Sequence, residues 1–184
     1  MTAACHRTLY DIQFAYEKGW NVSGNSLGFF EGGDHYSQED LNPFLETYTP
    51  YVPIGTSPIG ISIDGATIAV AASSDLKTGD ANGANYRMFT NLTDYHYYGT
   101  SLAAPLWASV ATLINEEKAL AGKGPIGFVN PTLDENAWAM KGITNGSNPK
   151  CGSSGFAAVE GWNSVTGLGT LDYPKLQRLF MGLP

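Results

Sequence analysis

The chain has 184 residues, of which 43% are hydrophobic and 15% charged, and 17 acidic against 10 basic residues give it a net charge of -7. This length suffices for one hydrophobic core, and the acidic balance argues against nucleic acid as a partner. The 22 glycines and 10 prolines are typical of a loop-rich, extracellular type of protein. No apolar run follows a basic start, so the sequence predicts neither a signal peptide nor a membrane span.

The first half of the chain predicts an alternation of strands and helices. The apolar runs 25–30 and 67–72 have the length and composition of buried parallel strands. Between them, Ser37-Gln38-Glu39-Asp40 is typical of a capping box that begins a helix. Asn42-Pro43 is a competing start, with proline at the first helical position.

Loops and a hairpin are expected next. Residues 47–58 contain three prolines and predict a loop, in which Ser57 takes part in a turn. Residues 79–84 predict a further turn, and residues 86–98 predict a hairpin or ribbon. Three tyrosines of this ribbon are expected to pack on a sheet, namely Tyr95, Tyr97 and Tyr98.

A long amphipathic helix is predicted after the hairpin, from Leu102 to a stop at Gly122. Its apolar residues recur at the helical period, at positions Leu102, Leu106, Val110, Leu113 and Ile114. The charged triplet Glu116-Glu117-Lys118 occupies the end of the helix that we expect to meet water.

Ser101 lies on a glycine-led turn at the start of this helix, in the stretch Gly99-Thr100-Ser101. Backbone N–H groups without partners at a helix N-terminus stabilise negative charge, which suits a nucleophilic hydroxyl. Pro105 is expected within the first turn, where a missing N–H removes little hydrogen bonding. The alternative is that Ser101 is only an N-cap, a position that serine favours.

Several longer motifs carry a resemblance to a known family. They are CHRTLYDI at 5–12, NSLGFFEGGDHYSQEDLNPF at 25–44, GTSLAAPLWASVATLINEE at 99–117, GKGPIGFVNPTL at 122–133, ITNGSNPKCGSSGFAAVEGW at 143–162 and VTGLGTLDYPKL at 165–176. Together they resemble the sedolisins, acid-acting serine-carboxyl peptidases that include fungal tripeptidyl peptidases.

The resemblance implies an α/β, subtilisin-like fold with a parallel sheet and flanking helices, in a single domain over residues 1–184. Within it, residues 1–66 match the start of the domain, and residues 67–184 carry the nucleophile and a calcium loop. It also implies secretion, peptide or protein substrates and Ser101 as the catalytic serine; neither a membrane nor an oligomeric state is indicated.

The family's catalytic base is missing from this sequence. In sedolisins a Glu activates the serine, an Asp four residues further along orients that Glu, and another Asp in an SGD turn completes the oxyanion site. None of the glutamates has an Asp four residues later; they are Glu17, Glu31, Glu39, Glu46, Glu116, Glu117, Glu135 and Glu160. Gly33-Asp34 and Gly79-Asp80 do not resemble the SGD turn. We therefore expect this chain to be inactive; the alternative function is a non-catalytic remnant that binds peptides or a peptidase partner.

Two neighbouring segments indicate where the missing residues belong. SIDGA at 62–66 resembles the stretch before the acid-bearing helix, and DLKTG at 75–79 resembles a stretch shortly before the nucleophile. In the family much of the domain lies between them. The sequence thus predicts a domain whose central part is deleted.

The calcium loop that the resemblance implies is degenerate. Its ligand positions correspond to the carbonyls of Ile143, Val159 and Gly161 and to the side chain of Asn163. Gly142 and Asn163 stand where the family has aspartates, so both carboxylates that calcium prefers are lost. We expect weak or absent calcium binding.

Two further groups of residues leave alternatives open. His96 with Asp94 is a possible substitute base for Ser101, but residues so close along a strand rarely fold back onto the serine that follows. Cys5 and Cys151 either pair or stay free, and the sequence favours free thiols. The other histidines, His6 and His35, lack metal-ligand spacing and are expected to be surface or packing residues.

Overall fold

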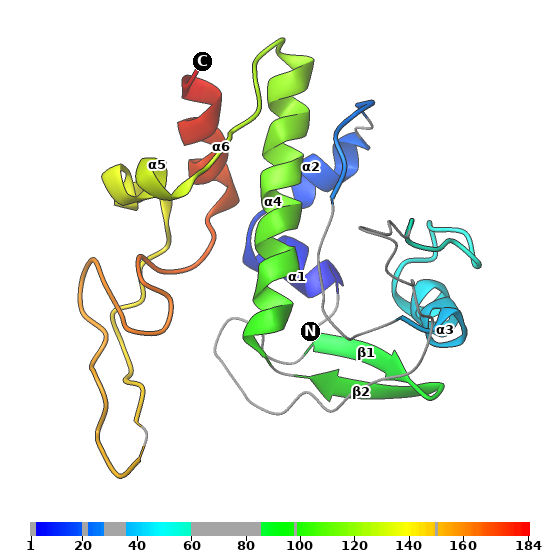
Figure 1. The fold of residues 1–184 in the computed structure, drawn as a ribbon, viewed down its shortest axis with the longest axis horizontal. Coiled ribbons are helices and arrows are strands. Elements are labelled where there is room, and N and C mark those ends of the chain that lie inside the picture. The colour runs from blue at the N-terminus through cyan, green and yellow to red at the C-terminus, as the bar shows by residue number, and fades with distance from the viewer. Residues whose placement is uncertain (1–2, 20–21, 28–35, 60–85, 98, 150) are drawn as a thin grey trace, which may run out of the picture.

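The computed structural model describes residues 3–19, 22–27, 36–59, 86–97, 99–149 and 151–184. These residues form six α-helices, one 3₁₀-helix and two strands (Figure 1). In chain order they are α1 (Ala3–Leu9), α2 (Gln13–Lys18), α3 (Gln38–Tyr48), β1 (Tyr86–Thr90), β2 (Thr93–Tyr97), α4 (Thr100–Leu120), α5 (Asn130–Glu135), η1 (Ala137–Ala139) and α6 (Tyr173–Gly182).

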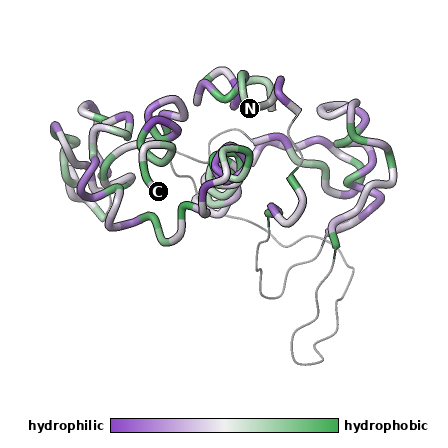
Figure 2. Tube along the Cα trace, turned by 90° about the horizontal axis from the view of Figure 1, so that it is seen from above, coloured by the Kyte–Doolittle hydropathy of each residue, from purple (hydrophilic) through white to green (hydrophobic). Residues whose placement is uncertain are grey.

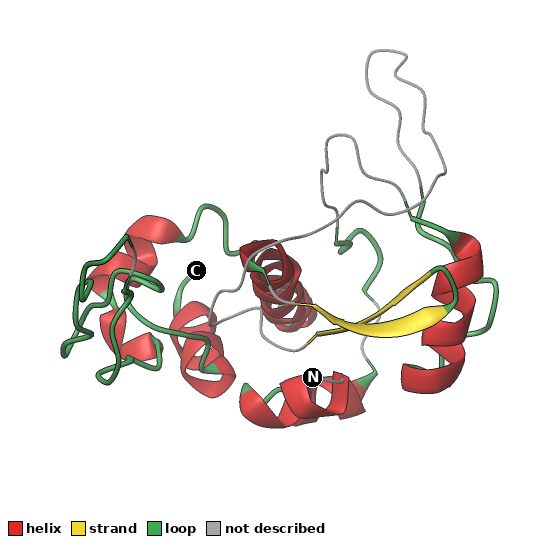
Figure 3. Ribbon diagram, turned by 90° about the horizontal axis from the view of Figure 1, so that it is seen from below, coloured by secondary structure: helices red, strands yellow, loops and turns green. Residues whose placement is uncertain are grey.

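Helix α4 is the axis of the molecule. Two perpendicular views place it between a loop-rich C-terminal part, with α5 and α6, and a part made of the hairpin and α3 (Figures 1 and 2). Seen from below, α1 and α2 lie beside the same helix (Figure 3). The predicted amphipathic helix is confirmed, although it begins at Thr100 and ends at Leu120, just before Gly122 at φ 71°.

The hydrophobic core lies where α4 meets α6 and the segment around α1 and α2. Val110 and Ile114 of α4 are each only 1% exposed. They belong to one cluster with Tyr10, Ile12, Ala15, Ala139, Met140, Leu171, Tyr173, Leu176, Leu179 and Phe180. Burying one large apolar side chain contributes about 1.5–3 kcal/mol, so this cluster is the main source of stability among the described residues.

The charged end of α4 is buried, and the expectation that it meets water is wrong. Glu116 accepts hydrogen bonds from the Val22 N–H and from Asn25 Nδ2, the latter at 2.5 Å. Lys118, 1% exposed, donates from Nζ to the carbonyls of Phe180, Leu183 and Pro184 at 2.9–3.3 Å. These partners come from distant parts of the chain, which the helical pattern alone does not reveal.

Glu117, between these two residues, is also bound. It accepts hydrogen bonds from the Tyr173 hydroxyl and from Gln177 Nε2, both on α6. The triplet Glu116-Glu117-Lys118 therefore clamps α4 to α6 and to residues 22–25. Polar groups that leave water need such partners, because an unpaired buried group costs free energy.

Helix α3 begins as the capping motif predicts. The Ser37 hydroxyl accepts a hydrogen bond from the Asp40 N–H at 3.3 Å. Pro43 lies inside the helix, so the competing start at Asn42-Pro43 is wrong. The helix continues to Tyr48, which shortens the predicted loop at its beginning.

The predicted hairpin is confirmed as an antiparallel pair, with Tyr86 opposite Tyr97 and Thr90 opposite Thr93. Asn91 and Leu92 form its turn with φ of 49° and 57°, the positive values that a tight two-residue turn requires. Both N–H groups of this turn donate to the Asp40 carboxylate, at 3.1 and 2.7 Å. The first turn of α3 thereby holds the tip of the hairpin.

A mixed α/β composition is confirmed, but the parallel sheet is not described. The predicted strands at 25–30 and 67–72 extend into or lie within residues outside the described ranges, as does the division at residue 66. Among the described residues the only sheet is the β1–β2 pair, and no helix is long and apolar enough to cross a lipid bilayer. The structure contains no disulfide between Cys5 and Cys151.

Candidate functional site

Ser101 lies on the exposed first turn of α4, directly after the extended residue Gly99. The Leu102 N–H donates to the Gly99 carbonyl at 3.0 Å, which closes this turn. The first N–H groups of a helix lack intrahelical acceptors and form its positive end. The position of Ser101 at a helix N-terminus is therefore as the sequence predicts.

Pro105 differs from expectation, because it lies in the second turn of α4 rather than the first. Its nitrogen has no hydrogen, so the Ser101 carbonyl loses the bond that residue 105 would otherwise donate. The Pro105 carbonyl itself accepts from the Ser109 hydroxyl at 2.7 Å. The start of α4 is thus less completely hydrogen-bonded than an ordinary helix.

No catalytic partner contacts Ser101 within the described part of the chain. None of its hydrogen bonds or ion pairs joins the Ser101 hydroxyl to a carboxylate or an imidazole. The glutamates nearest in sequence, Glu116 and Glu117, are bound at the opposite end of α4. Glu31 and the Gly33-Asp34 and Gly79-Asp80 pairs lie outside the described residues.

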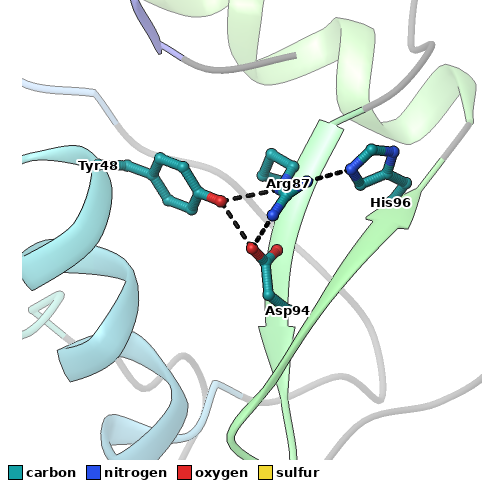
Figure 4. Close-up of polar contacts among 4 residues, drawn as sticks. All are labelled: Tyr48, Arg87, Asp94 and His96. Atoms are coloured by element: carbon teal, nitrogen blue, oxygen red, sulfur yellow. Dashed lines mark hydrogen bonds and ion pairs between the residues drawn. The ribbon is translucent and has the colours of Figure 1, made fainter.

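His96 and Asp94 belong to a polar cluster that joins the hairpin to α3 (Figure 4). Tyr48 donates to Asp94 Oδ2 at 2.7 Å, and Arg87 Nε donates to the Tyr48 oxygen at 2.8 Å. Arg87 also forms an ion pair with Asp94 and contacts His96 Nε2. The guanidinium therefore stands between the carboxylate and the imidazole.

This arrangement has a clear electrostatic consequence. The hydrogen bond from Arg87, followed by that from Tyr48, lowers the pKa of Asp94, and the hydrogen bond to Asp94 raises the pKa of Tyr48. A catalytic triad needs the carboxylate on one imidazole nitrogen and the serine on the other. Here Asp94 is bound by Arg87 and Tyr48 instead. The four residues therefore connect the hairpin to α3 and do not form a catalytic triad.

The amino-acid sequence alone does not predict this cluster as a unit. Arg87 and His96 are cross-strand neighbours in the hairpin register, a pairing that follows once the turn is placed at 91–92. The hairpin predicted over residues 86–98 assigned no turn residues, so it left this pairing open. The contribution of Tyr48 depends on how α3 packs, and no local pattern indicates it. The local sequence therefore carries information on the pairing of Arg87 with His96, and none on the contacts of Tyr48.

The residues of the expected calcium loop all lie in the loop between η1 and α6. Lys141 and Thr170 form an antiparallel bridge at the base of this loop, with N–H to carbonyl distances of 2.9 Å in both directions. Val159 and Trp162 form another bridge, in which the Val159 carbonyl accepts from the Trp162 N–H at 3.2 Å. Gly161, at φ 83°, allows the tight turn between them.

These residues do not fit a calcium ion. Calcium requires several oxygen ligands with free lone pairs, and anionic ones above all. Gly142 offers no side chain, and the Asn163 Oδ1 already accepts two backbone N–H hydrogen bonds within its own turn, so neither position supplies a carboxylate. Ile143 is half-buried. Across the described residues no group of three His, Cys, Asp or Glu side chains is placed to bind a metal.

An open cavity of about 480 Å³ lies elsewhere, between α3 and the tip of the hairpin. It is lined by Glu39, Asn42, Pro43, Glu46, Ile54 and Leu92. Ser101 is not among these residues. The cavity is therefore not part of the site at the start of α4.

No protein-family model matches this chain. Curated proteins do match it in part. Aorsin of Aspergillus oryzae is 44% identical over 104 residues, which cover 56% of this chain and 16% of that protein. Tripeptidyl-peptidase sed1 of Aspergillus fumigatus is 55% identical over 86 residues, 47% of this chain and 13% of that protein. Tripeptidyl-peptidase 1 of Homo sapiens is 34% identical over 89 residues, 45% of this chain and 16% of that protein.

The matched stretches thus span less than a fifth of each relative's length. A three-residue motif can match by chance, but identities of 34–44% over 89–104 residues do not arise in that way. The resemblance to the sedolisins that the sequence motifs predict is therefore confirmed over about half of this chain.

Proposed function

We propose that this chain is a sedolisin-like peptidase domain in which Ser101 occupies the position of the nucleophile. The observation that carries the proposal is the exposed hydroxyl on the first turn of α4, in a chain of which half resembles tripeptidyl peptidases. In such chemistry the serine oxygen attacks a peptide carbonyl, and the resulting oxyanion is stabilised by preorganised donors. An intact relative would act on peptides or proteins at acid pH and be secreted.

We also propose that the chain is catalytically inactive as it stands. A neutral serine hydroxyl is a poor nucleophile unless a base removes its proton. The sequence lacks the Glu and Asp spacing that supplies this base, and the one substitute that we considered, His96, contacts Arg87. The deletion of the domain's central part, between residues 66 and 75, accounts for the loss of both the base and the oxyanion Asp. We also propose that the rest of the chain retains part of the parallel sheet of a subtilisin-like fold.

Peptide hydrolysis by the purified chain tests both statements. The unmodified chain and Ser101→Ala are compared from acid to neutral pH with a mixed peptide library, after circular dichroism shows that both are folded. We expect equal background cleavage in the two proteins. Cleavage that disappears with Ser101 would keep the nucleophile and refute inactivity.

His96→Ala provides a matched control for the substitute base. If Ser101-dependent cleavage exists, we expect it to be unchanged in this variant, because Arg87 occupies the imidazole Nε2. A selective loss with unchanged folding would make His96 the base. Binding of peptides by both Ser101 variants without cleavage would instead favour the non-catalytic function.

The alternative, a remnant that binds peptides or a peptidase partner, has one observation in its favour. Within the described ranges, β1 and β2 pair only with each other, so each strand has one edge without a strand partner. Exposed edges accept further strands by backbone hydrogen bonding. Sedimentation over a range of protein concentrations tests this alternative. Self-association of the chain would favour open strand edges, and a monomer at all concentrations would count against them.

A further inference from the structure

The side chain of Asn163 organises the last turn of the loop before α6. It is only 5% exposed. Its Oδ1 accepts from the Val165 and Thr166 N–H groups at 3.1 and 2.8 Å, and its Nδ2 donates to the Thr166 hydroxyl oxygen at 2.6 Å and the Gly167 carbonyl at 3.5 Å. The backbones of Asn163 and Gly167 also exchange two hydrogen bonds of 2.9 Å. Both ends of the amide are therefore used within five residues of chain.

The Asn163 amide donates hydrogen bonds here, which an ionised carboxylate at the same position could not do. Asn presents one acceptor and two donor hydrogens, whereas an ionised Asp presents acceptors only. The Thr166 hydroxyl can rotate to suit either group, but the Gly167 carbonyl accepts and cannot donate. The Nδ2 side of Asn163 therefore faces acceptor oxygens, to which an amide can donate and an ionised carboxylate cannot.

The turn at residues 163–167 also precedes the segment that leads into α6. Shortly after it, Gly169 approaches Lys141 so closely that an added Cβ would lie 2.2 Å from the Lys141 carbonyl oxygen. The bridge between Lys141 and Thr170 follows, and then the buried residues Leu171 and Tyr173, which are 2% exposed. The conformation of residues 163–167 therefore determines how the chain enters α6 and the core.

We propose that the Asn163 amide holds this loop without a metal ion, because its Nδ2 donates hydrogen bonds to the oxygens of Thr166 and Gly167 where the resemblance implies a cation. The loop is then an internally hydrogen-bonded, calcium-independent positioning element for α6. Asn163 acts on the fold and is not a ligand or a catalytic residue. The proposal does not depend on the proposed function.

The first test uses the unmodified chain. Thermal unfolding is followed by circular dichroism in EDTA and across a titration with calcium chloride, each at pH 7. We expect the same midpoint throughout, because the turn offers no carboxylate to a cation and its Asn163 Oδ1 already accepts two N–H groups. A saturable rise of the midpoint with calcium, reversed by EDTA, would overturn the proposal without any variant.

The second test asks whether Asn163 acts as a hydrogen-bond donor or only fills space. We expect Asn163→Ala to lower the unfolding midpoint by about 5 °C at every pH, since the turn loses all its side-chain bonds. Asn163→Asp should lower it by a similar amount of about 5 °C at pH 7, and this deficit should shrink as the pH falls towards 4 and the carboxyl gains a proton to donate.

Ser164→Ala is the matched control, because its hydroxyl has no hydrogen bond among the described residues. It should leave the midpoint within about 1 °C of the unmodified chain. Full stability of Asn163→Asp at pH 7, or a calcium-dependent rise in its midpoint, would refute the donor role. Should Asn163→Ala fail to fold, the pH profile of Asn163→Asp and the calcium titration still decide the question.

Discussion

The two ends of α4 use their polar residues in opposite ways. At the N-terminal end Ser101 is exposed, and no side chain of the described residues is bonded to it. At the C-terminal end Glu116, Glu117 and Lys118 are buried or half-buried and fully engaged with distant segments. One helix therefore combines an accessible hydroxyl with a rigid polar anchor.

This difference shows how a site can be separated from the interactions that hold it. The anchor joins α4 to α6 and to residues 22–25, so the helix is fixed at the end far from Ser101. Changes at the anchor should lower stability, while changes at Ser101 should not. Three substitutions test the contrast, and a fourth, at His6 of α1, tests a buried group outside it.

The largest effect is expected from Lys118→Met. The methionine retains the apolar stem, but the carbonyls of Phe180, Leu183 and Pro184 lose the ammonium that binds them. We expect a loss of about 2 kcal/mol in the free energy of unfolding, measured by urea denaturation. Lys175→Met removes only an exposed ion pair with Asp172 and serves as the control. Equal losses in both variants would show that the buried ammonium is not an anchor.

Tyr173→Phe should have a smaller effect. It removes the hydroxyl that donates to Glu117 and keeps the ring, which is 2% exposed. We expect a loss of about 1 kcal/mol. The control Tyr95→Phe alters an exposed hydroxyl on β2 and should be neutral. A neutral Tyr173→Phe would mean that Glu117 is held by Gln177 alone.

A weaker effect, visible as pH dependence, is expected at His6. Its ring lies 4.4 Å from that of Tyr86 and 6.4 Å from that of Tyr10, and its Nε2 is buried without a partner among the described residues. Burial, with a smaller effect of the positive N-terminus, lowers the pKa of His6, and burial raises the pKa of Tyr86 to about 12.

The folded chain therefore favours neutral His6. The stabilising contribution is present above the ordinary histidine pKa of about 6.5 and is lost as the pH falls through that value towards the lower folded pKa. His6→Phe keeps the ring contact and cannot titrate. Between pH 7 and 5 it should lose less stability than the unmodified chain, and parallel pH profiles would contradict the assignment.

The smallest effect is expected from Ser101→Ala. Its side chain is exposed, so the free energy of unfolding should change by no more than about 0.5 kcal/mol. Urea denaturation beside Lys118→Met gives the comparison directly. The alternative that Ser101 is only an N-cap is wrong, because Gly99 is the N-cap of α4 and no side chain caps this helix. A loss as large as that of Lys118→Met would therefore contradict the separation of Ser101 from the anchor.

Local sequence rules predicted the elements that local interactions form. The period of apolar residues predicted α4, the stretch 86–98 predicted the hairpin, and Ser37 predicted the start of α3. Pro43 misled because proline also fits inside this helix, where the N-cap at Ser37 already determined the start. The position of Ser101 near the start of α4 followed from the same apolar period.

The helix, the hairpin, the serine near a helix N-terminus and the family resemblance could all be predicted from the amino-acid sequence. The burial of Glu116 and Lys118 and the binding of Asp94 to Arg87 and Tyr48 become visible only in the folded chain. They depend on partners that are far apart along the chain. Val22 and Glu116 are 94 residues apart, and Lys118 and Phe180 are 62 apart. Which polar side chains lose water depends on such partners, and no pattern within one element specifies them.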